Sequence, residues 1–295
     1  MTEEEIVKNI ILLQNENPAL RQLALEQLAQ FTGNHQAVDA IIKSLQDNDK
    51  NVRSYAADIL GKTTERHALI ALSHSLEDTA WEVRQSTISS FGKIKNPDTV
   101  PFIVTALKDE HPQVRFSAAR ELKKFTSPSV IKPLFETLKD DTESVREEAK
   151  STLLNFSVNV PASMVAGFLL DANKLVREVV VEFLTSRVEG NPTPHLERAY
   201  QDKEWDVRFL ALKELSKVIQ KLEGTDSKLL EINLSALNDE NAKVRFQAIS
   251  NLGLLNDPSA LDPLGEIAIN DEDSNNRLMA TETMTSIRRA LRLEE

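Results

Sequence analysis

Aspartate and arginine recur at a fixed spacing along this sequence, and both are residue types that bind ligands or take part in acid–base chemistry. Seven arginines directly follow a valine: Arg53, Arg84, Arg115, Arg146, Arg177, Arg208 and Arg245. Six residues before each of them stands an aspartate: Asp47, Asp78, Asp109, Asp140, Asp171, Asp202 and Asp239. From Arg53 to Arg208 every interval is 31 residues, and Arg21 and Arg277 are less regular copies at the two ends. A catalytic site occurs once, whereas a pair present in every copy serves what every copy needs, so we interpret these residues as a structural ladder.

The other residues that could carry chemistry do not form a recognisable site. None of the five histidines stands at a metal-ligand spacing from a second histidine or a carboxylate on one helix: His35, His67, His74, His111 and His195. Cysteine is absent from the sequence, which excludes disulfides, thiolate metal sites and cysteine nucleophiles. Glycine-rich phosphate loops are also missing. We therefore expect no metal, no cofactor and no enzymatic activity from these residues.

The charge balance narrows the choice of partners. The chain has 35 Lys and Arg against 46 Asp and Glu, which gives a net charge of −11. This charge repels phosphate backbones, so Trp81 and Trp205 are not interpreted as base-stacking residues of a nucleic-acid groove. No apolar run approaches the ~18 residues of a membrane span, and the acidic start differs from a signal peptide. We expect a cytoplasmic protein without membrane insertion or nucleic-acid binding, whose protein partner has a neutral or basic contact surface.

The fixed period is the signature of a solenoid of repeated units. Apolar residues recur at −1, +3 and +7 relative to each ladder arginine, as in Val114, Ala118 and Leu122, and this spacing marks the buried face of a helix. Residues whose side chains can cap the start of this helix stand four residues before the arginine: Asn17, Asp49, Thr142, Asn173, Asn241 and Asp273. An apolar segment before each cap supplies the first helix of a hairpin. We predict an all-α solenoid, a single array of about nine two-helix repeats: 1–33, 34–64, 65–95, 96–126, 127–157, 158–188, 189–221, 222–257 and 258–295.

Glycine and proline mark the connections between these repeats. Gly61, Gly92 and Gly253 each follow the last position of an apolar stripe, and we interpret them as turns between repeats. The prolines in 191–194 are expected to shorten the first helix of the seventh repeat. Between Arg208 and Arg245 the interval is six residues longer than the period, and we place the excess in a surface loop around 222–226.

The order Asp, Val-Arg, Ala, Leu, as in Asp109, Val114, Arg115, Ala118 and Leu122, resembles HEAT repeats, especially the short form of phycobilisome-lyase-like HEAT proteins. The resemblance covers essentially the whole chain and implies a right-handed α-solenoid. It also implies that the turn aspartate accepts hydrogen bonds from backbone amides and from an arginine of the same or a neighbouring repeat. Proteins with this repeat have many unrelated roles, so the fold does not determine the function.

Two enzyme classes with HEAT repeats lead to different expectations. Deoxyhypusine hydroxylase holds two irons with repeated His-Glu pairs, and this sequence contains no His-Glu dipeptide. A phycobilin lyase, or a chaperone acting on phycobiliproteins, is the alternative function, with a bilin or a phycobiliprotein as partner. No residue of this sequence can be matched to a catalytic role in those lyases, and covalent colour after mixing with bilin and apoprotein would identify that activity.

The helix face opposite the buried stripe is the candidate binding surface. At about 100° per residue it comprises positions −2, +1, +5 and +8, with −3 at its edge. In HEAT-like solenoids the second helix of each repeat typically lines the concave side. The residues expected on this face are Trp81, Gln85, Phe116, Arg120, Glu147, Glu178, Glu182, Trp205, Phe209 and Phe246. Aromatic rings beside an acidic centre indicate an interaction surface, which predicts a non-enzymatic scaffold or adaptor; the alternative is that the rings fill gaps between adjacent second helices.

Overall fold

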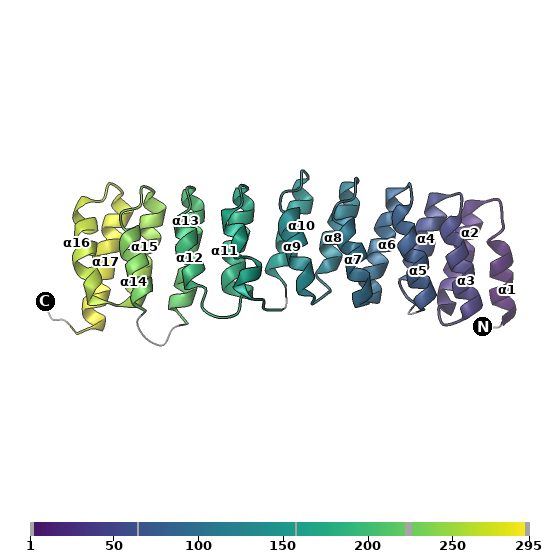
Figure 1. The fold of residues 1–295 in the computed structure, drawn as a ribbon, viewed down its shortest axis with the longest axis horizontal. Helices are drawn as coiled ribbons and strands as arrows, with labels where there is room; N and C mark the ends of the chain where they lie inside the picture. Colours follow the sequence, from purple (N-terminus) through teal and green to yellow (C-terminus); the bar gives the residue numbers. More distant parts are fainter. Residues whose placement is uncertain (1–2, 64, 157, 222–225, 293–295) are drawn as a thin grey trace. The chain divides into compact units, whose positions relative to one another are not determined.

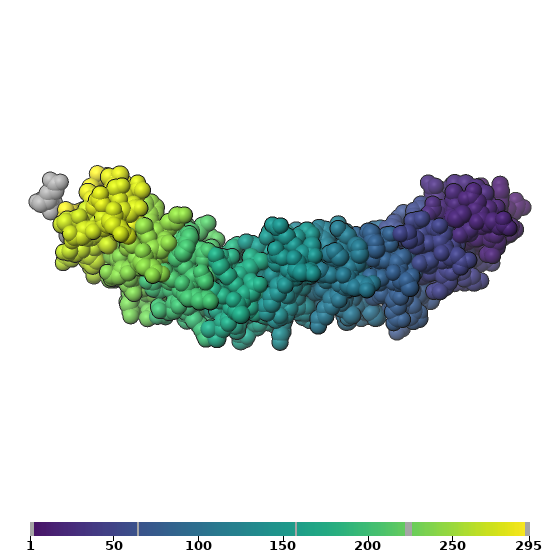
Figure 2. All heavy atoms as spheres, turned by 90° about the horizontal axis from the view of Figure 1, so that it is seen from above, coloured from purple at the N-terminus to yellow at the C-terminus, as the bar shows by residue number. Residues whose placement is uncertain are grey.

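The computed structural model describes residues 3–63, 65–156, 158–221 and 226–292, where the regular elements are helices (Figure 1). The chain forms two compact units, Met1–Phe156 and Ser157–Glu295. We call them unit 1 and unit 2 and describe each by itself. In the space-filling view, the repeats of each unit follow one another in chain order (Figure 2).

Unit 1 consists of helix hairpins that repeat along the chain. The first helices of its repeats are α1 (Glu3–Leu12), α3 (His35–Lys43), α5 (Arg66–His74), α7 (Val100–Ala106) and α9 (Ile131–Thr137). The second helices are α2 (Pro18–Leu28), α4 (Lys50–Leu60), α6 (Trp81–Ile94), α8 (Pro112–Leu122) and α10 (Glu143–Leu154). Within this unit, consecutive second helices pack against each other (Figure 1). The predicted α-solenoid architecture is confirmed.

Unit 2 has the same plan. Its second helices are α11 (Lys174–Arg187), α13 (Trp205–Ile219), α15 (Ala242–Leu255) and α17 (Ser274–Ala290), and consecutive ones pack together. Its first helices are α12 (Thr193–Tyr200), α14 (Ser227–Ala236) and α16 (Leu261–Asn270). Helix α12 is short and begins directly after Pro192, as the prolines predict. Of the loop expected around 222–226, residues 222–225 lie outside the described residues.

The sixth repeat departs from the predicted hairpin in its first half. Two 3-10 helices, η6 (Ala162–Met164) and η7 (Ala166–Leu170), stand where the first α-helix is expected. The segment before them is extended, because Val160 donates its amide to Arg187 O at 2.9 Å and accepts from the Glu189 amide at 3.1 Å. This bridge and Pro161 leave only a short segment before the ladder turn, and Gly167 within it disfavours an α-helix.

The apolar stripe forms the core as predicted. Position +3 is completely buried in every repeat: Ala24, Ala56, Thr87, Ala118, Ala149, Val180, Ala211, Ala248 and Ala280. Val114 and Leu122, at −1 and +7 in the fourth repeat, are also completely buried. Small side chains at +3 let the two helices of a hairpin approach closely, which explains the preference for alanine.

Five of the six predicted capping residues accept a hydrogen bond from an amide at the helix start: Asn17, Asp49, Asn173, Asn241 and Asp273. Thr142 is the exception, since its side chain makes no capping bond. Its hydroxyl instead donates to Asp141 Oδ1 at 3.1 Å and accepts from Arg115 Nη2 at 3.3 Å. Arg115, the ladder arginine of the preceding repeat, therefore binds the hydroxyl oxygen that would otherwise accept the capping hydrogen bond.

The three glycines that the sequence predicts to be turns lie where neighbouring second helices contact each other. Gly92 lies inside α6 and Gly253 inside α15, so the prediction that they form turns is wrong. Gly61 ends α4 with an ordinary φ of −63°. A Cβ atom on Gly61 would stand only 2.9 Å from Ser90 Cα in the next repeat, so the glycine permits close helix packing. Ser90 Oγ also donates to Ala57 O of α4 at 2.7 Å across this contact.

Candidate protein-binding face

Within each unit, the ladder joins consecutive repeats. Arg84 of the third repeat donates from Nε to Asp109 Oδ2 and from Nη2 to Asp109 Oδ1 of the fourth, both at 2.8 Å. Its Nη1 donates to the main-chain oxygen of Asp78 in its own repeat, also at 2.8 Å. Asp109 Oδ1 further accepts from the His111 amide at 2.8 Å. The carboxylate partner thus comes from the neighbouring repeat, while the arginine's own repeat supplies a carbonyl.

This arrangement, in which one guanidinium donates two hydrogen bonds to one carboxylate, recurs in both units, and we call it the fork. The other pairs are Arg21 with Asp47, Arg53 with Asp78 and Arg115 with Asp140 in unit 1, and Arg177 with Asp202, Arg208 with Asp239 and Arg245 with Asp271 in unit 2. At most 14% of any of these side chains is exposed. Arg146 donates to Asp140 O at 2.8 Å, and Asp171 accepts from the Asn173 amide at 2.9 Å. Such a buried, repeated fork orients neighbouring repeats and presents little surface to a ligand.

The hydrogen bonds of the ladder keep its aspartates and arginines charged. Burial raises the pKa of the Asp109 carboxyl, but hydrogen bonds from the Arg84 guanidinium and the His111 amide outweigh burial and hold this pKa below its usual value. The net pKa shift is also downward for the other affected ladder carboxyls: Asp47, Asp78, Asp140, Asp202 and Asp271. The hydrogen bond to Asp109 raises the pKa of Arg84. The fork is therefore an ion pair at neutral pH.

In unit 1, two residues of the predicted face contact the next repeat. Trp81, half-buried at the start of α6, stacks on the His111 ring with 4.2 Å between centroids and 2° between planes. Gln85 Nε2 donates to Ser117 Oγ of α8 at 3.1 Å. These two side chains fit the gap-filling alternative as well as the binding one, since they bridge adjacent second helices.

The next predicted residues of unit 1 are more open to solvent. Phe116 is half-buried, and the exposed Arg120 guanidinium lies over its ring at 5.8 Å from the centroid. Glu147 on α10 is exposed. Of the residues on this stretch, Arg120 and Glu147 offer charged groups, and Phe116 an apolar edge, to a partner.

In unit 2, the acidic residues near α11 belong partly to an ion-pair cluster. Lys174 Nζ lies 3.5 Å from Glu178 Oε1 and also binds Asp206 on α13. Glu182 is half-buried one turn further along α11. The negative charge expected at the centre of the face is thus reduced by Lys174.

The aromatic residues of unit 2 form the most exposed apolar part of the face. Trp205 is 36% exposed and Phe246 40% exposed, on the consecutive second helices α13 and α15. Lys243 Nζ lies over the Trp205 ring at 5.2 Å from its centroid. Phe209 is half-buried, whereas Leu278, which shares the +1 position with Phe246, is 60% exposed on α17. Large apolar side chains therefore lie open on three neighbouring helices.

Position +8, which the helical periodicity places on the exposed face, is exposed in some repeats, at Lys123 and Thr285, and buried in the second and third repeats. Gly61 and Gly92 occupy it and are buried. A Cβ on Gly92 would stand 1.8 Å from Glu121 Oε2 of the next repeat, whose side chain is itself buried. Helical periodicity places +8 outward for an isolated hairpin, but at Gly61 and Gly92 the next repeat packs closely enough to cover this position.

A groove on the face formed by the second helices of unit 1 was not predicted from the sequence. It has a volume of about 600 Å³ and lies over α2 and α4, lined among others by Gln22, Glu26 and Tyr55. Gln22 is at the +1 position of the first repeat, so the sequence places it on the correct face. Nothing in the sequence indicates that the surface is hollow there, because the hollow depends on which side chains fail to meet across two helices.

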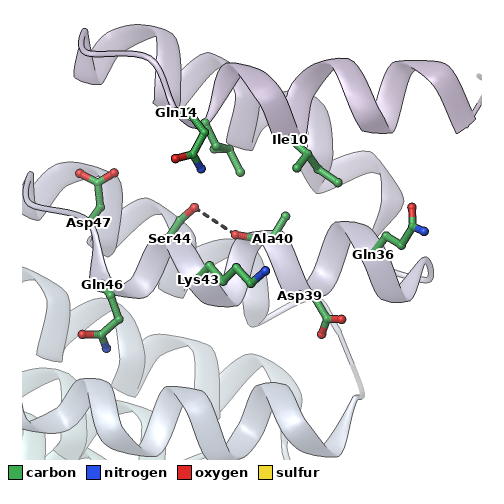
Figure 3. Close-up of a pocket in the computed structure, with 10 residues that line it drawn as sticks. Ile10, Gln14, Gln36, Asp39, Ala40, Lys43, Ser44, Gln46 and Asp47 are labelled. Atoms are coloured by element: carbon green, nitrogen blue, oxygen red, sulfur yellow. Dashed lines mark hydrogen bonds between the residues drawn. The ribbon is translucent and has the colours of Figure 1, made fainter.

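Hollows also occur between first helices. One of about 430 Å³ lies between α1 and α3, where Ile10 and Gln14 stand opposite Asp39 and Lys43 (Figure 3). A second, of about 420 Å³, lies between α7 and α9 at the same positions of the repeat. These hollows reflect the repeat itself and gather no catalytic set of side chains.

Two further properties concern the part of the chain that the structure describes. Within it, no three His, Asp or Glu side chains come together as ligands for a metal ion. Nor is any helix there both long enough and apolar enough to cross a membrane.

Comparison with known proteins identifies the repeat. The family model of HEAT repeats matches residues 7–91, 71–153 and 230–293. No curated protein matches the sequence. The solved structure of Kap121p bound to Nup53p is 14% identical with a TM-score of 0.69, and the match covers 98% of this chain and 38% of that one. Kap95p with RanGDP is 16% identical with a TM-score of 0.56, covering 96% of this chain and 45% of that one.

A third structure comes from a different functional class. The complex of CpcE and CpcF of phycocyanin lyase from Nostoc sp. PCC7120 is 21% identical with a TM-score of 0.45, covering 77% of this chain and 91% of that one. This chain spans less than half of the Kap121p and Kap95p chains, and at these identities the likeness concerns the fold. With the family model covering most of the sequence and the fork repeated in both units, the chain belongs to the HEAT-repeat family.

Proposed function

We propose that this protein is a non-enzymatic scaffold or adaptor that binds a protein partner on the face formed by the second helices of its repeats. One observation carries the proposal: Trp205, Phe246 and Leu278 are 36%, 40% and 60% exposed on three neighbouring second helices of unit 2. Exposed apolar side chains that are grouped, and not scattered singly, mark interaction sites. Tryptophan and phenylalanine supply much contact area when a partner covers them.

Structures with this fold provide a supporting analogy. Kap121p is seen bound to Nup53p, and Kap95p is seen with RanGDP. The proposal assigns this chain the same general use of the fold, which is to hold another protein. The identity of that protein does not follow from the likeness.

The test begins with capture of a partner on the immobilised protein and its identification by mass spectrometry. The purified partner is then titrated against wild type, Trp205→Ala and Phe246→Ala. Because central aromatic residues of an interface contribute about 2 kcal/mol or more, each variant is expected to bind roughly 30-fold more weakly. Ile269→Ala is the matched control, since Ile269 is 75% exposed on α16, a first helix.

Two results would contradict the proposal. Equal affinity of wild type, Trp205→Ala and Phe246→Ala would show that the partner binds elsewhere. A loss of helical structure in Trp205→Ala, measured by circular dichroism, would show that this ring fills a gap between helices, as in the alternative interpretation.

A further inference from the structure

The ladder arginine of the ninth repeat is anchored like the others but lacks their carboxylate. Arg277 Nη1 donates to the main-chain oxygens of Asp271 at 2.6 Å and Glu272 at 3.2 Å. Arg245 makes the equivalent bonds one repeat earlier, and its Nε and Nη2 then donate to Asp271. Among the described residues, Nε and Nη2 of Arg277 have no such acceptor. Two donors oriented for a carboxylate are therefore free.

An apolar position of the ninth repeat is also uncovered. Ile269, eight residues before Arg277, is 75% exposed. The equivalent Leu45, Leu107 and Leu237 are 3%, 6% and 3% exposed, and each of their repeats is followed by another in the same unit. Helix α17 packs against α15 on one side, and no described helix follows it (Figure 1). Ile269 and Arg277 thus occupy positions that a following repeat covers elsewhere in the chain.

The first repeat shows the complementary side of the same contact. Its Leu20 and Leu23, at positions −1 and +2, are 37% and 43% exposed. In the later repeats of unit 1 the valine at −1 is completely buried: Val52, Val83, Val114 and Val145. The apolar surface that a preceding repeat covers in those four is open in the first.

Asn15 changes this surface at the ladder position. It stands six residues before Arg21, where later repeats have aspartate. Its Oδ1 accepts the Asn17 amide at 2.9 Å, which leaves the NH2 group as the other end of the side chain. In an internal fork the second carboxylate oxygen accepts from arginine Nε, as Asp109 Oδ2 does from Arg84. An asparagine puts a donor against that donor, so Asn15 does not complete a fork.

We propose that the ninth repeat binds a helix hairpin of another protein whose turn carries an aspartate at the ladder position, and that Asn15 keeps copies of this chain from binding each other in the same way. The aspartate accepts from Nε and Nη2 of Arg277 in a charge-assisted fork, and an apolar side chain of the hairpin covers Ile269. The donor on Asn15 is a mismatch that selects against a second copy. The inference goes beyond the proposed function, because it uses neither Trp205 nor Phe246.

The polar outer side of α17 suits reversible binding. Thr281 is exposed at +4, where Ile88, Leu212 and Ile249 are completely buried. A polar surface keeps an uncovered repeat soluble, and it leaves most of the selectivity to the fork of Arg277.

The test mixes two forms of the full chain. The labelled probe is the double variant Asn15→Asp and Arg277→Ala, which offers a carboxylate in its first repeat and cannot bind a second probe. The receiver is the wild-type protein. Sedimentation velocity with fluorescence detection, at rising receiver concentration, measures the association of one probe with one receiver. We expect this probe to associate, and a labelled Arg277→Ala single variant, which keeps Asn15, to stay unbound in the same mixture.

Receiver variants then locate the contact. Arg277→Ala in the receiver should weaken association about tenfold or more, the range for hydrogen bonds between charged groups. Arg277→Lys should weaken it similarly, because lysine keeps the charge but does not form the fork. Ile269→Ala should weaken it about fivefold through lost apolar contact. The matched control is Arg288→Ala, which removes an exposed arginine from the last turn of α17.

Three outcomes would overturn the assignment. If the double variant does not associate with wild type, the ninth repeat is not a binding surface for an aspartate turn. If the probe that keeps Asn15 binds equally well, the residue at this position does not exclude a second copy. If Arg288→Ala weakens association as much as Arg277→Ala, the net charge and not the fork is responsible. The proposed function fails separately, through equal affinity of the captured partner for wild type and Trp205→Ala.

Discussion

Arg84 and Asp109 join the third and fourth repeats through two parallel hydrogen bonds of 2.8 Å, and Asp109 also accepts the His111 amide. Only 7% of the Arg84 side chain is exposed. In Asp109→Ala this guanidinium loses its carboxylate and the amide loses its acceptor. We expect the free energy of unfolding to fall by about 2–4 kcal/mol, because nearly buried polar groups are costly when they lose their partners. Urea unfolding followed by circular dichroism measures the loss.

The adjacent residue provides a matched control. Glu110 Oε1 lies 3.1 Å from Arg84 Nη2, but 84% of the Glu110 side chain is exposed. Glu110→Ala should therefore cost only ~0–1 kcal/mol, as exposed pairs do. Asp109→Asn should cost less than Asp109→Ala, because Asn15, which stands six residues before Arg21 in the first repeat, shows that an amide oxygen can accept the turn amide, here from Asn17 at 2.9 Å. Equal losses in Glu110→Ala and Asp109→Ala would refute the structural role of the fork.

The ladder also predicts a pH dependence of stability. The pKa of Asp109 lies below its usual value in the folded protein, whereas an aspartate in an unfolded chain titrates at about 3.9. A lowered folded pKa stabilises the protein fully above the unfolded pKa, and the stabilisation is lost as pH falls toward the folded pKa. The difference in unfolding free energy between wild type and Asp109→Asn should be constant from neutral pH to about pH 5 and should shrink below about pH 4. A difference that grows on acidification would contradict the sign of the shift.

Gly61→Ala tests the packing of second helices against each other. The added Cβ would meet the main-chain Cα of Ser90 at 2.9 Å, and a main-chain atom cannot move aside cheaply. The φ of Gly61 is −63°, so alanine adds no backbone strain there and any loss comes from packing. We expect a loss of about 1–3 kcal/mol in thermal or urea unfolding, the range for overpacking. Gly33→Ala is the control, since no atom lies within 4 Å of its added Cβ, and a loss as large as that of Gly61→Ala would refute the packing explanation.

Much of the fold can be predicted from the sequence because the same weak spacing pattern recurs in successive repeats. A single Val114, Ala118 and Leu122 triplet does not define a helix, but the same spacing in successive copies does. The ladder residues were identified for the same reason. The sequence leaves open which repeat supplies the carboxylate, because Arg84 has one aspartate six residues before it and another 25 residues after it. The structure decides in favour of the second, Asp109.

Contacts without a constant residue type could not be predicted. Ser90, Thr152 and Asn251 occupy the same position, and each donates to a main-chain oxygen of the preceding second helix. A carbonyl carries no sequence signature, and three different donors show no pattern. For the same reason the sequence wrongly predicts a turn at Gly92, although this glycine lies inside a helix and makes room for Glu121 of the next repeat.

The last prediction concerns how far damage to one ladder pair spreads. In an array whose repeats contact only their neighbours, stability is approximately a sum of local and nearest-neighbour terms. Asp109→Ala removes the fork between α6 and α8, and Asp109 belongs to the turn that begins α8. Hydrogen exchange followed by mass spectrometry should therefore show faster exchange in the third to fifth repeats, while α15 and α17 exchange as in wild type. A uniform acceleration along the whole chain would show that the repeats unfold as one cooperative body, and the nearest-neighbour description would then be wrong for this protein.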